Sequence, residues 1–339
     1  MAKAKAAKTK RPNPKSKIQN PKSVRVALVG AGGMANGVHY PSLSEMKDVR
    51  MAAICDLVPE KAHETAERFA IPKVYADYRT MLEEVKPDAV YVLMPPHQLF
   101  DVAVDVLKRK HHLFIEKPPG VTAYQTRQLA RHAKRNKVIG MAGFQRRYVP
   151  LINTLKKKVE ARGPIHTAEV NFIKFATDVD YYDGAIDILS CDAIHAVDTL
   201  RYLCGGDVVS VASSVRAIDA DEANASYALI VFSTGATGLL KTNWACGHRV
   251  FSVEMHTTGA SAYAEPDVGG ALYRDGATES ERYDPGECAK SDAMWRRLGF
   301  FGENRHFIDC IKKGRQPRSS FEDAAATMEL VERIYHSAI

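Results

Sequence analysis

The sequence predicts a two-part α/β protein, in which a doubly wound parallel sheet is followed by an α+β domain with a large, mostly antiparallel open sheet. Three observations predict this fold. Strand and helix patterns alternate over residues 24–143, a glycine-rich string separates the first strand from the first helix, and strand patterns then follow one another without helices over residues 208–273. We expect the first domain to span residues 23–144 and the second to span residues 145–339.

The first domain combines six short strand patterns with amphipathic segments. The strands are expected at residues 24–29, 49–56, 74–75, 89–93, 112–116 and 138–144. The run at 89–93 is continuously apolar between two prolines, which is typical of a strand buried on both faces. Crossover helices are expected at residues 34–46, 59–69, 78–85, 99–108 and 122–135. This alternation predicts a parallel sheet with helices on both faces.

The second domain has a different pattern. Helices are expected at residues 151–161, 189–203, 302–313 and 321–337, and strands at residues 166–177, 208–217, 226–233, 236–246, 250–258 and 271–273. Successive strands without intervening helices predict a mostly antiparallel sheet. Residues 275–291 are polar and rich in turn formers, so we expect a long surface loop there.

The net charge of +7 belongs to the start of the chain. Residues 1–22 carry seven lysines and Arg11 without an acidic residue, and the rest has 39 basic and 40 acidic residues. Residues 1–22 are too polar to bury a core, so they predict a disordered basic tail. Because the remaining chain is nearly neutral, we expect no specific nucleic-acid partner.

Two further classes are disfavoured by composition. No run of about 18 apolar residues occurs, so no membrane partner is expected. The six cysteines are scattered without a C-x-x-C pair, which favours a reducing cytoplasm over a disulfide framework. No cluster with metal-ligand spacing is evident, so we expect no metal site.

The string from Gly30 to Ala35 fits the dinucleotide-binding pattern G-x-G-x-x-A between a strand and a helix. Gly30 allows the tight turn, Gly32 lets a pyrophosphate approach the backbone, and the helix start offers free N–H groups. Asp56 ends the second strand, where it can accept hydrogen bonds from the adenosine ribose. No arginine follows Asp56, which favours NAD over NADP. The first domain is therefore predicted to be an NAD-binding Rossmann domain.

Five segments resemble motifs of the Gfo/Idh/MocA oxidoreductases, which are relatives of glucose–fructose oxidoreductase and inositol dehydrogenase. The segments follow one another along the chain in the same order as in that family. The segments are Glu116-Lys117-Pro118, the turn 94–97, the stretch 143–148, His195 with Asp198 as H-x-x-D, and Glu303-Asn304. The resemblance covers residues 24–337. It implies an NAD(H)-dependent oxidoreductase that moves a hydride to or from a secondary hydroxyl of a sugar, cyclitol or sugar derivative.

The resemblance also implies roles for individual residues. Lys117, at the carboxyl end of a parallel strand, is expected to contact the reacting hydroxyl and stabilise a developing alkoxide. His195 is expected to be the general acid–base, because an imidazole exchanges protons near neutral pH. Asp198 is expected to be structural. Pro118 is expected to follow a cis bond.

One position departs from the family pattern. Many members carry Asp four residues before the histidine, where this chain has Cys191, and Asp192 stands three residues before it instead. On a continuous helix both positions neighbour His195, about 100° apart. We therefore expect Asp192 to support His195 from a different direction, completing the catalytic set of Lys117, His195 and Asp192.

The remaining expected contacts divide between cofactor and substrate. For NAD they are Gly30, Gly32, Gly33, Met34, Asp56, Pro95, His97, Glu116, Lys117 and Gln145. For the substrate they are Lys117, Arg147, Tyr148, Lys174, Tyr182, Cys191, Asp192 and His195.

Two alternative functions keep the cofactor. In one, NAD serves a redox glycosidase that oxidises, eliminates and reduces without net release of NADH. In the other, the chain is a non-catalytic NAD-binding sensor, which Cys191 would permit. An open antiparallel sheet would expose one face, so a homodimer or homotetramer is expected.

Overall fold

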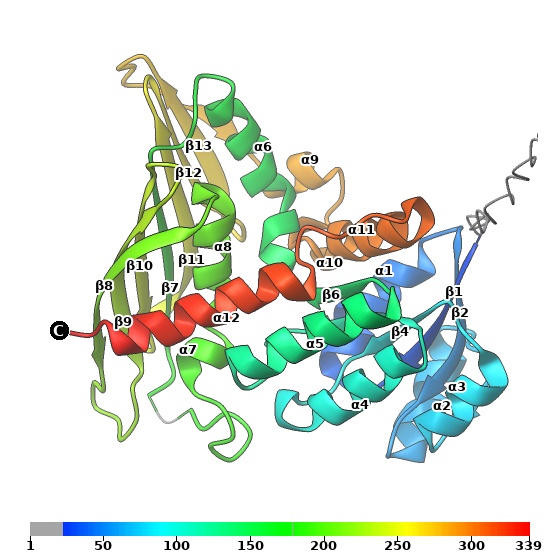
Figure 1. Cartoon of the computed structure of the whole chain (residues 1–339). Helices are drawn as coiled ribbons and strands as arrows, with labels where there is room; N and C mark the ends of the chain where they lie inside the picture. Colours follow the sequence, from blue (N-terminus) through cyan, green and yellow to red (C-terminus); the bar gives the residue numbers. More distant parts are fainter. Residues whose placement is uncertain (1–22, 178) are drawn as a thin grey trace, which may run out of the picture.

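The structure is a computed structural model that describes residues 23–177 and 179–339 (Figure 1). The predicted disorder of residues 1–22 lies outside the described residues. Two sheets, one of six strands and one of eight, form the two parts of the fold. The predicted fold class is confirmed in both parts.

The first sheet is parallel throughout, in the order β3-β2-β1-β4-β5-β6. Its strands are β1 Val24–Val29, β2 Val49–Cys55, β3 Val74–Tyr75, β4 Ala89–Val92, β5 His112–Glu116 and β6 Gly140–Gly143. The helices are α2 Pro59–Arg68, α3 Tyr78–Val85, α4 Pro96–Lys108 and α5 Ala123–Asn136. Strands β1 and β4 lie side by side although they are not consecutive, so the chain reverses direction across the sheet between them. Such a switch point is where open α/β sheets bind ligands.

The helix after the glycine turn is irregular, whereas the sequence predicted one regular helix. A π-helical turn, η1 Ala35–His39, leads into α1 Tyr40–Ser44. The N–H of Tyr40 reaches back to Ala35, and Pro41 has no N–H with which to continue an α-helical ladder. This irregularity carries His39 beneath the sheet, where the side chain is fully buried.

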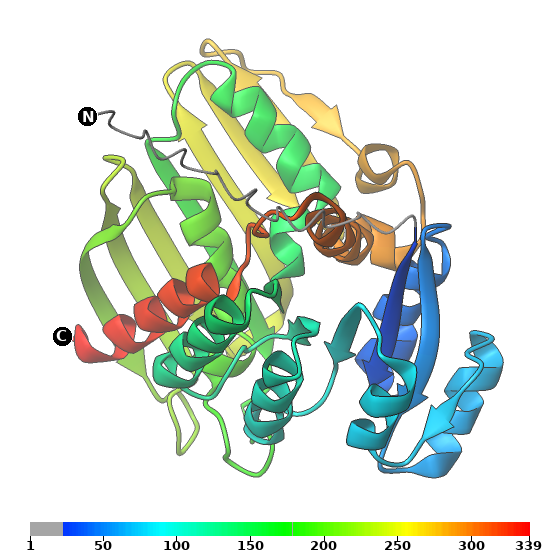
Figure 2. The same ribbon diagram turned by 45° about the vertical axis from the view of Figure 1, so that its right-hand side comes forward.

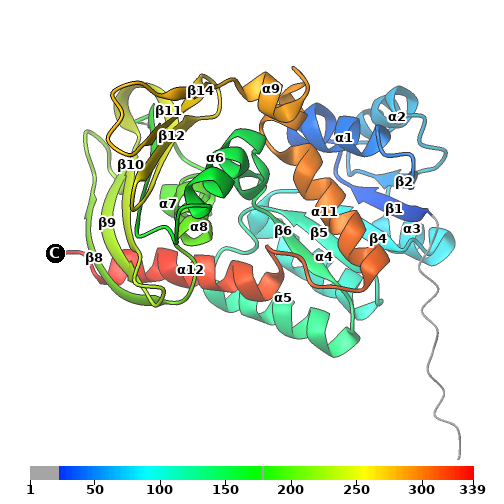
Figure 3. The same ribbon diagram turned by 90° about the horizontal axis from the view of Figure 1, so that it is seen from above.

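The second sheet has the order β14-β13-β12-β11-β7-β10-β9-β8 and is antiparallel except for the central pair β7 and β10. Its strands are β7 Thr167–Phe175, β8 Val208–Arg216, β9 Ala225–Phe232, β10 Thr237–Asn243, β11 Ala245–Thr257, β12 Ala260–Glu265, β13 Gly269–Arg274 and β14 Glu281–Tyr283. Helices α6 Pro150–Glu160, α8 Ile194–Cys204 and α12 Phe321–His336 pack on one face. Seen from above, these helices stand between this sheet and the first domain (Figure 3).

Three sequence-based expectations for the second domain were wrong in detail. The helix at 189–203 is two helices, α7 Ile188–Cys191 and α8, separated by Asp192 and Ala193. The loop at 275–291 contains β14 and the short helix α9 Pro285–Ala289. Strand β12 and helix α10 Met294–Arg297 were missed, because the first is short and alanine-rich and the second has a single turn.

The last part of the chain returns to the first domain. The backbone of Ser319 pairs with Ala142 on β6, and Ser319 Oγ donates to the Ala142 carbonyl at 2.9 Å. Phe321 fills the space beside Gly140, where a Cβ would lie 2.3 Å from the phenyl ring. Helix α12 then packs along α5 while its far end reaches β8 (Figures 1 and 2). Residues 319–336 therefore join the edge of the first sheet to the second domain.

In the described parts of the chain, no helix has the length and apolar character needed to cross a lipid bilayer.

Candidate active site

Two adjoining cavities lie at the carboxyl ends of the parallel strands. One, of about 450 Å³, is lined by Gly30, Asp56 and neighbours. The other, of about 470 Å³, is lined by Lys117 and His195. Both are bordered by Gly32 and by residues 93–95, so they form one continuous site. An elongated ligand would reach from the glycine turn to Lys117.

The glycine turn fits a dinucleotide on two grounds. Gly30 has a φ of +103°, and a Cβ there would lie 2.2 Å from the carbonyl oxygen of Leu93, so only glycine is tolerated. A Cβ at Gly32 or Gly33 would instead meet nothing within 4 Å. The space over these two glycines is free for a pyrophosphate, as the sequence pattern predicts.

Asp56 lies beside the same turn. One carboxylate oxygen accepts from the Ala31 N–H at 2.6 Å, and the other accepts from the Val58 N–H at 2.8 Å. These bonds fix the carboxylate at the end of β2, where it lines the smaller cavity. Its position is the one from which an acidic residue binds the ribose hydroxyls of NAD.

Lys117 follows β5 directly and reaches across the larger cavity toward the second domain. Its Nζ donates to the Cys191 carbonyl at 3.1 Å and lies 3.6 Å from the Asp192 carboxylate. The Cys191 carbonyl is available because α7 ends there. The Lys117–Pro118 bond is cis, as the resemblance implied.

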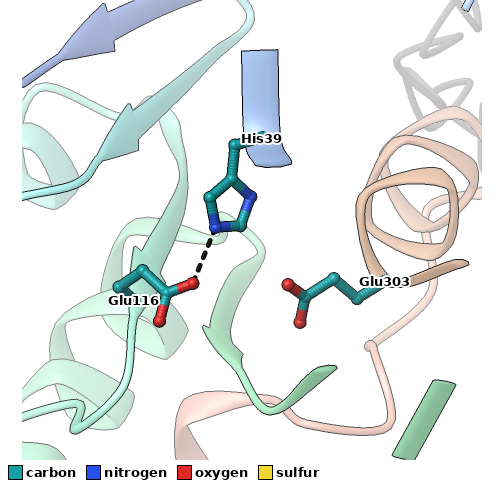
Figure 4. Close-up of side chains that lie close together, drawn as sticks. All are labelled: His39, Glu116 and Glu303. Carbon is teal, nitrogen blue, oxygen red and sulfur yellow. Dashed lines mark hydrogen bonds and ion pairs between the residues drawn. The ribbon is translucent and has the colours of Figure 1, made fainter. Parts of the chain in front are cut away.

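A polar cluster that includes His39, Glu116 and Glu303 lies next to Lys117 (Figure 4 shows these three side chains). Glu116 accepts from the backbone N–H of Lys117 at 3.0 Å and lies 2.6 Å from His39 Nε2. The other ring nitrogen of His39 lies 3.3 Å from the Asn304 amide oxygen. Glu303 completes the cluster, and burial, followed by the charge of Glu116, raises its pKa well above the ordinary value.

His39, Glu116 and Glu303 offer nitrogen and oxygen atoms that all lie within 4.8 Å of one another. Carboxylates bind metal ions in their deprotonated form, and burial together with the charge of Glu116 raises the pKa of Glu303. His39, Glu116 and Asn304 form a hydrogen-bonded support for the end of β5, whereas the two carboxylate oxygens of Glu303 have no hydrogen-bond partner within the described residues. That the chain uses no metal stays a prediction.

Asp192 is the centre of the charged groups at the cavity. Its carboxylate binds Lys174 Nζ at 2.6 Å and the Tyr181 hydroxyl at 3.1 Å, in addition to Lys117. Burial alone would raise the Asp192 pKa, but the nearby Lys117, His195 and Lys174 hold it well below the ordinary value. Asp192 therefore stays ionised and orders both lysines.

His195 lines the cavity from the first turn of α8 and is 6% exposed. Its Nδ1 has no hydrogen-bond partner within the described residues. Burial, followed by the charges of Lys117 and Arg146, holds its pKa well below 6.5. The imidazole is therefore neutral at physiological pH and can accept a proton.

The expected support of His195 by Asp192 stays a prediction, and the structure shows how the two groups are related. The interrupted helix places Asp192 in the break, and its oxygens bind Lys174 and Tyr181 rather than the imidazole. Asp192 acts on His195 through its charge. Cys191 is buried, and burial raises the pKa of its thiol to about 11, so the thiol is neutral.

Most of the other expected residues lie at the site. Gly33, Met34, Pro95, Glu116, Gln145 and Tyr182 line the larger cavity. Tyr182 also lies near His97, with the two rings tilted and their centroids 5.4 Å apart. Lys174 contacts the site through Asp192, because its Nζ donates to the Asp192 carboxylate. The same Nζ lies 4.6 Å from the centroid of the Trp244 ring.

Arg147 and Tyr148 are placed elsewhere, so the expectation that they contact substrate is corrected. Arg147 is buried against Asp198, with Nε–Oδ2 at 2.7 Å and Nη2–Oδ1 at 2.5 Å. It also pairs with Asp323 at 2.6 Å. Tyr148 is buried beside His306 and beneath Arg318. The structural role expected for Asp198 agrees with these contacts.

Sequence reasoning missed Arg146 and Arg249, which both line the larger cavity. Arg146 belongs to the 3₁₀ turn η2 Gln145–Tyr148, and Arg249 lies in the irregular part of β11 where the pairing with β7 shifts. The adjacent arginines 146 and 147 lie in different surroundings in this turn, and no local sequence pattern predicts which of them lines the cavity.

Comparison with known proteins agrees with this architecture. Residues 24–144 match the oxidoreductase family with an NAD-binding Rossmann fold, and residues 174–263 match the GFO/IDH/MocA C-terminal domain. The chain is 24% identical over 323 residues to myo-inositol 2-dehydrogenase of Thermotoga maritima, covering 91% of this chain and 94% of the relative. It is 22% identical over 321 residues to scyllo-inositol 2-dehydrogenase (NAD(+)) of Bacillus subtilis, covering 91% and 92%.

The fold is similar to the crystal structure of a dehydrogenase from Chromobacterium violaceum, with a TM-score of 0.85 and 23% identity over 94% of this chain and 96% of that chain. Both domains, in their order along the chain, are thus those of one family. The chain belongs to the Gfo/Idh/MocA family of NAD-binding oxidoreductases.

Proposed function

We propose that the chain is an NAD(H)-dependent dehydrogenase that acts on a secondary hydroxyl of a sugar, cyclitol or related polyol. The observation that carries the proposal is that Lys117 and His195 line one cavity beside the glycine turn. Two relatives that match most of this chain are named as inositol dehydrogenases, which supports a cyclic polyol as the substrate.

Each group at the site has a chemical task in this proposal. In oxidation the hydroxyl of the substrate would lose its proton to His195, and NAD⁺, when bound, would accept the hydride from the carbinol carbon, so the products would be a ketone, NADH and a proton. Lys117 binds the reacting oxygen and stabilises negative charge as it develops. Asp192 keeps both Lys117 and Lys174 in place.

The cofactor is proposed to lie along the two cavities. Gly32 and Gly33 would face the pyrophosphate, Asp56 would face the adenosine ribose, and Pro95 and Gln145 would border the nicotinamide end. NAD, when bound, supplies the hydride acceptor.

The test is NADH formation by the purified full chain with NAD⁺ and a panel of sugars and inositols. Lys117→Met should lower kcat by about 10²–10³-fold, because one preorganised donor to the developing oxyanion is lost. Lys134→Met, on the exposed side of α5, is the matched control and should keep the wild-type rate. Failure of every polyol to give NADH, with NAD bound, would refute the dehydrogenase and turn attention to the glycosidase and sensor alternatives.

A second copy of the chain is proposed to cover the open face of the second sheet. In the described residues, helices cover one face only (Figures 1 and 3). Cross-strand neighbours on the other face include Leu229 and Leu239, and Tyr263 is 39% exposed on β12. Burying such apolar side chains favours a homodimer or homotetramer. Sedimentation that finds only monomers at micromolar concentration would contradict this.

A further inference from the structure

Arg146 is a buried cation on the wall of the larger cavity without a counter-ion. The residue is 4% exposed, and its Nε and Nη1 have no hydrogen-bond partner within the described residues. Its guanidinium lies over the Phe251 ring, 4.3 Å from the centroid. An aromatic face holds the cation in position but does not satisfy its N–H groups. Leaving buried donors unsatisfied is costly unless a ligand supplies the acceptors.

The neighbouring Arg147 shows how this chain treats a structural arginine. Its guanidinium donates to both carboxylate oxygens of Asp198 and to the carbonyl of Arg318, and it forms an ion pair with Asp323. Two arginines at consecutive positions are therefore equally buried, but only one has acidic partners. Packing alone does not require Arg146, because an uncharged side chain would fill the same space without desolvating a cation.

The acidic groups at the cavity are already engaged. Glu116 binds His39, and Asp192 binds Lys174 and lies beside Lys117. Arg249, half exposed at the mouth of the cavity, lies 3.2 Å from Asp267. Among the described residues that line this cavity, Arg146 is thus the arginine or lysine that has no acidic side chain within ion-pair distance.

We propose that this cavity selects polyols that carry a carboxylate, such as sugar acids, with the buried Arg146 as the specificity-determining residue and Arg249 as a second cation at the mouth. The inference rests on the proposed function and names its substrate class. A guanidinium binds a carboxylate through two parallel N–H···O bonds along one edge, from Nε with Nη2 or from Nη1 with Nη2, and each of these edges of Arg146 contains a nitrogen without a partner in the described residues.

The surrounding electrostatics agree with an anionic ligand. Burial and the charge of Arg249 lower the pKa of Arg146 to about 10. Lys117, Arg146 and Arg249 all lower the pKa of His195. A carboxylate would offset the positive charge of these three side chains.

The experiment compares matched acid and neutral sugars on the full chain. Initial rates with NAD⁺ are measured for D-glucuronate against D-glucose and for D-galacturonate against D-galactose. Calorimetry on NADH-loaded protein measures binding of the same four sugars without turnover. We expect at least one acid to be preferred over its neutral parent, in kcat/KM or in affinity.

Arg146→Met should reduce that preference by about 10- to 100-fold, the usual contribution of hydrogen bonds to a charged group. Arg146→Lys keeps the charge but not the fork, so it should retain part of the preference and remains informative if the methionine variant unfolds. Arg249→Gln should have a smaller effect, which added salt should mask. Arg135→Met, on the exposed side of α5, is the matched control and should leave the preference unchanged.

Three outcomes would overturn the inference. The neutral sugars are used or bound as well as the acids, Arg146→Met weakens acids and neutral sugars equally, or a sugar phosphate such as glucose 6-phosphate outcompetes both. Oxidation of neutral sugars without a preference for acids would leave the proposed dehydrogenase standing. Arg146-dependent binding of an acid without oxidation of any sugar would support the inference and refute the dehydrogenase.

Discussion

Two aspartates six residues apart, Asp192 and Asp198, each form an acidic cluster with basic side chains. The first cluster lies at the cavity and the second lies in the protein interior. Asp192, in the break before α8, has a side chain 21% exposed and binds two lysines. Asp198, inside α8, has a side chain 1% exposed and binds the fork of Arg147. Lysine ammonium groups are single-point contacts that can turn toward a ligand, whereas an arginine fork fixes one geometry. The two clusters therefore differ in two respects: the Asp192 cluster is accessible from the cavity and contains lysines, whereas the Asp198 cluster is buried and contains an arginine.

The largest expected effect comes from breaking the Asp198 cluster. Asp198→Asn leaves Arg147 buried with a weakened partner, so the free energy of unfolding should fall by about 3–5 kcal/mol. Asp192→Asn is the matched variant at the accessible cluster and should cost much less stability while lowering activity. Urea denaturation of both variants measures the difference. Equal losses of stability would break the comparison.

His195 should determine where kcat/KM falls on the acid side of its pH profile. Because its pKa lies well below 6.5, the neutral form that accepts a proton persists as pH falls through the range in which an ordinary histidine is protonated. We expect kcat/KM for oxidation to fall only at pH well below 6.5. His195→Gln should lower kcat by about 10²-fold and remove this fall. A fall of the wild-type kcat/KM at or above pH 6.5 would contradict the assignment.

The smallest effect is expected at Glu303, next to His39 and Glu116, where a substitution should change how protein stability depends on pH. The folded-state pKa of Glu303 is raised, so the folded protein holds a proton that the unfolded chain releases above about 4.5. Its contribution to stability is complete below pH 4.5 and is lost as pH rises through the folded-state pKa. Glu303→Gln keeps a neutral side chain, so it should flatten the alkaline decline in melting temperature. Glu322→Gln, on the exposed side of α12, should keep the wild-type profile.

Local patterns predicted those parts of the site that depend on neighbouring residues. Gly30 and Asp56 could be assigned because a glycine turn between strand and helix has few structural solutions. Lys117 and His195 lie on different domains, and only the family resemblance connected them before the structure did. The same resemblance implied the cis bond before Pro118, which the structure contains.

Other features depend on contacts that no local pattern contains. The break at Asp192 and Ala193 interrupts an apolar-faced segment that reads as one helix, yet it frees the Cys191 carbonyl for Lys117. His39 and Asn304 meet across 265 positions of sequence. The directions taken by Arg146 and Arg147 depend on which partners the folded chain brings near each of them.

The pairing of Ser319 with β6 has a consequence for how the molecule is made. Strand β6 occupies residues 140–143, but the backbone that borders it is translated some 175 residues later. During synthesis the nucleotide-binding half therefore emerges from the ribosome with one border of its sheet still unpaired. That pairing can form only after residues 319 and 320 have been synthesised.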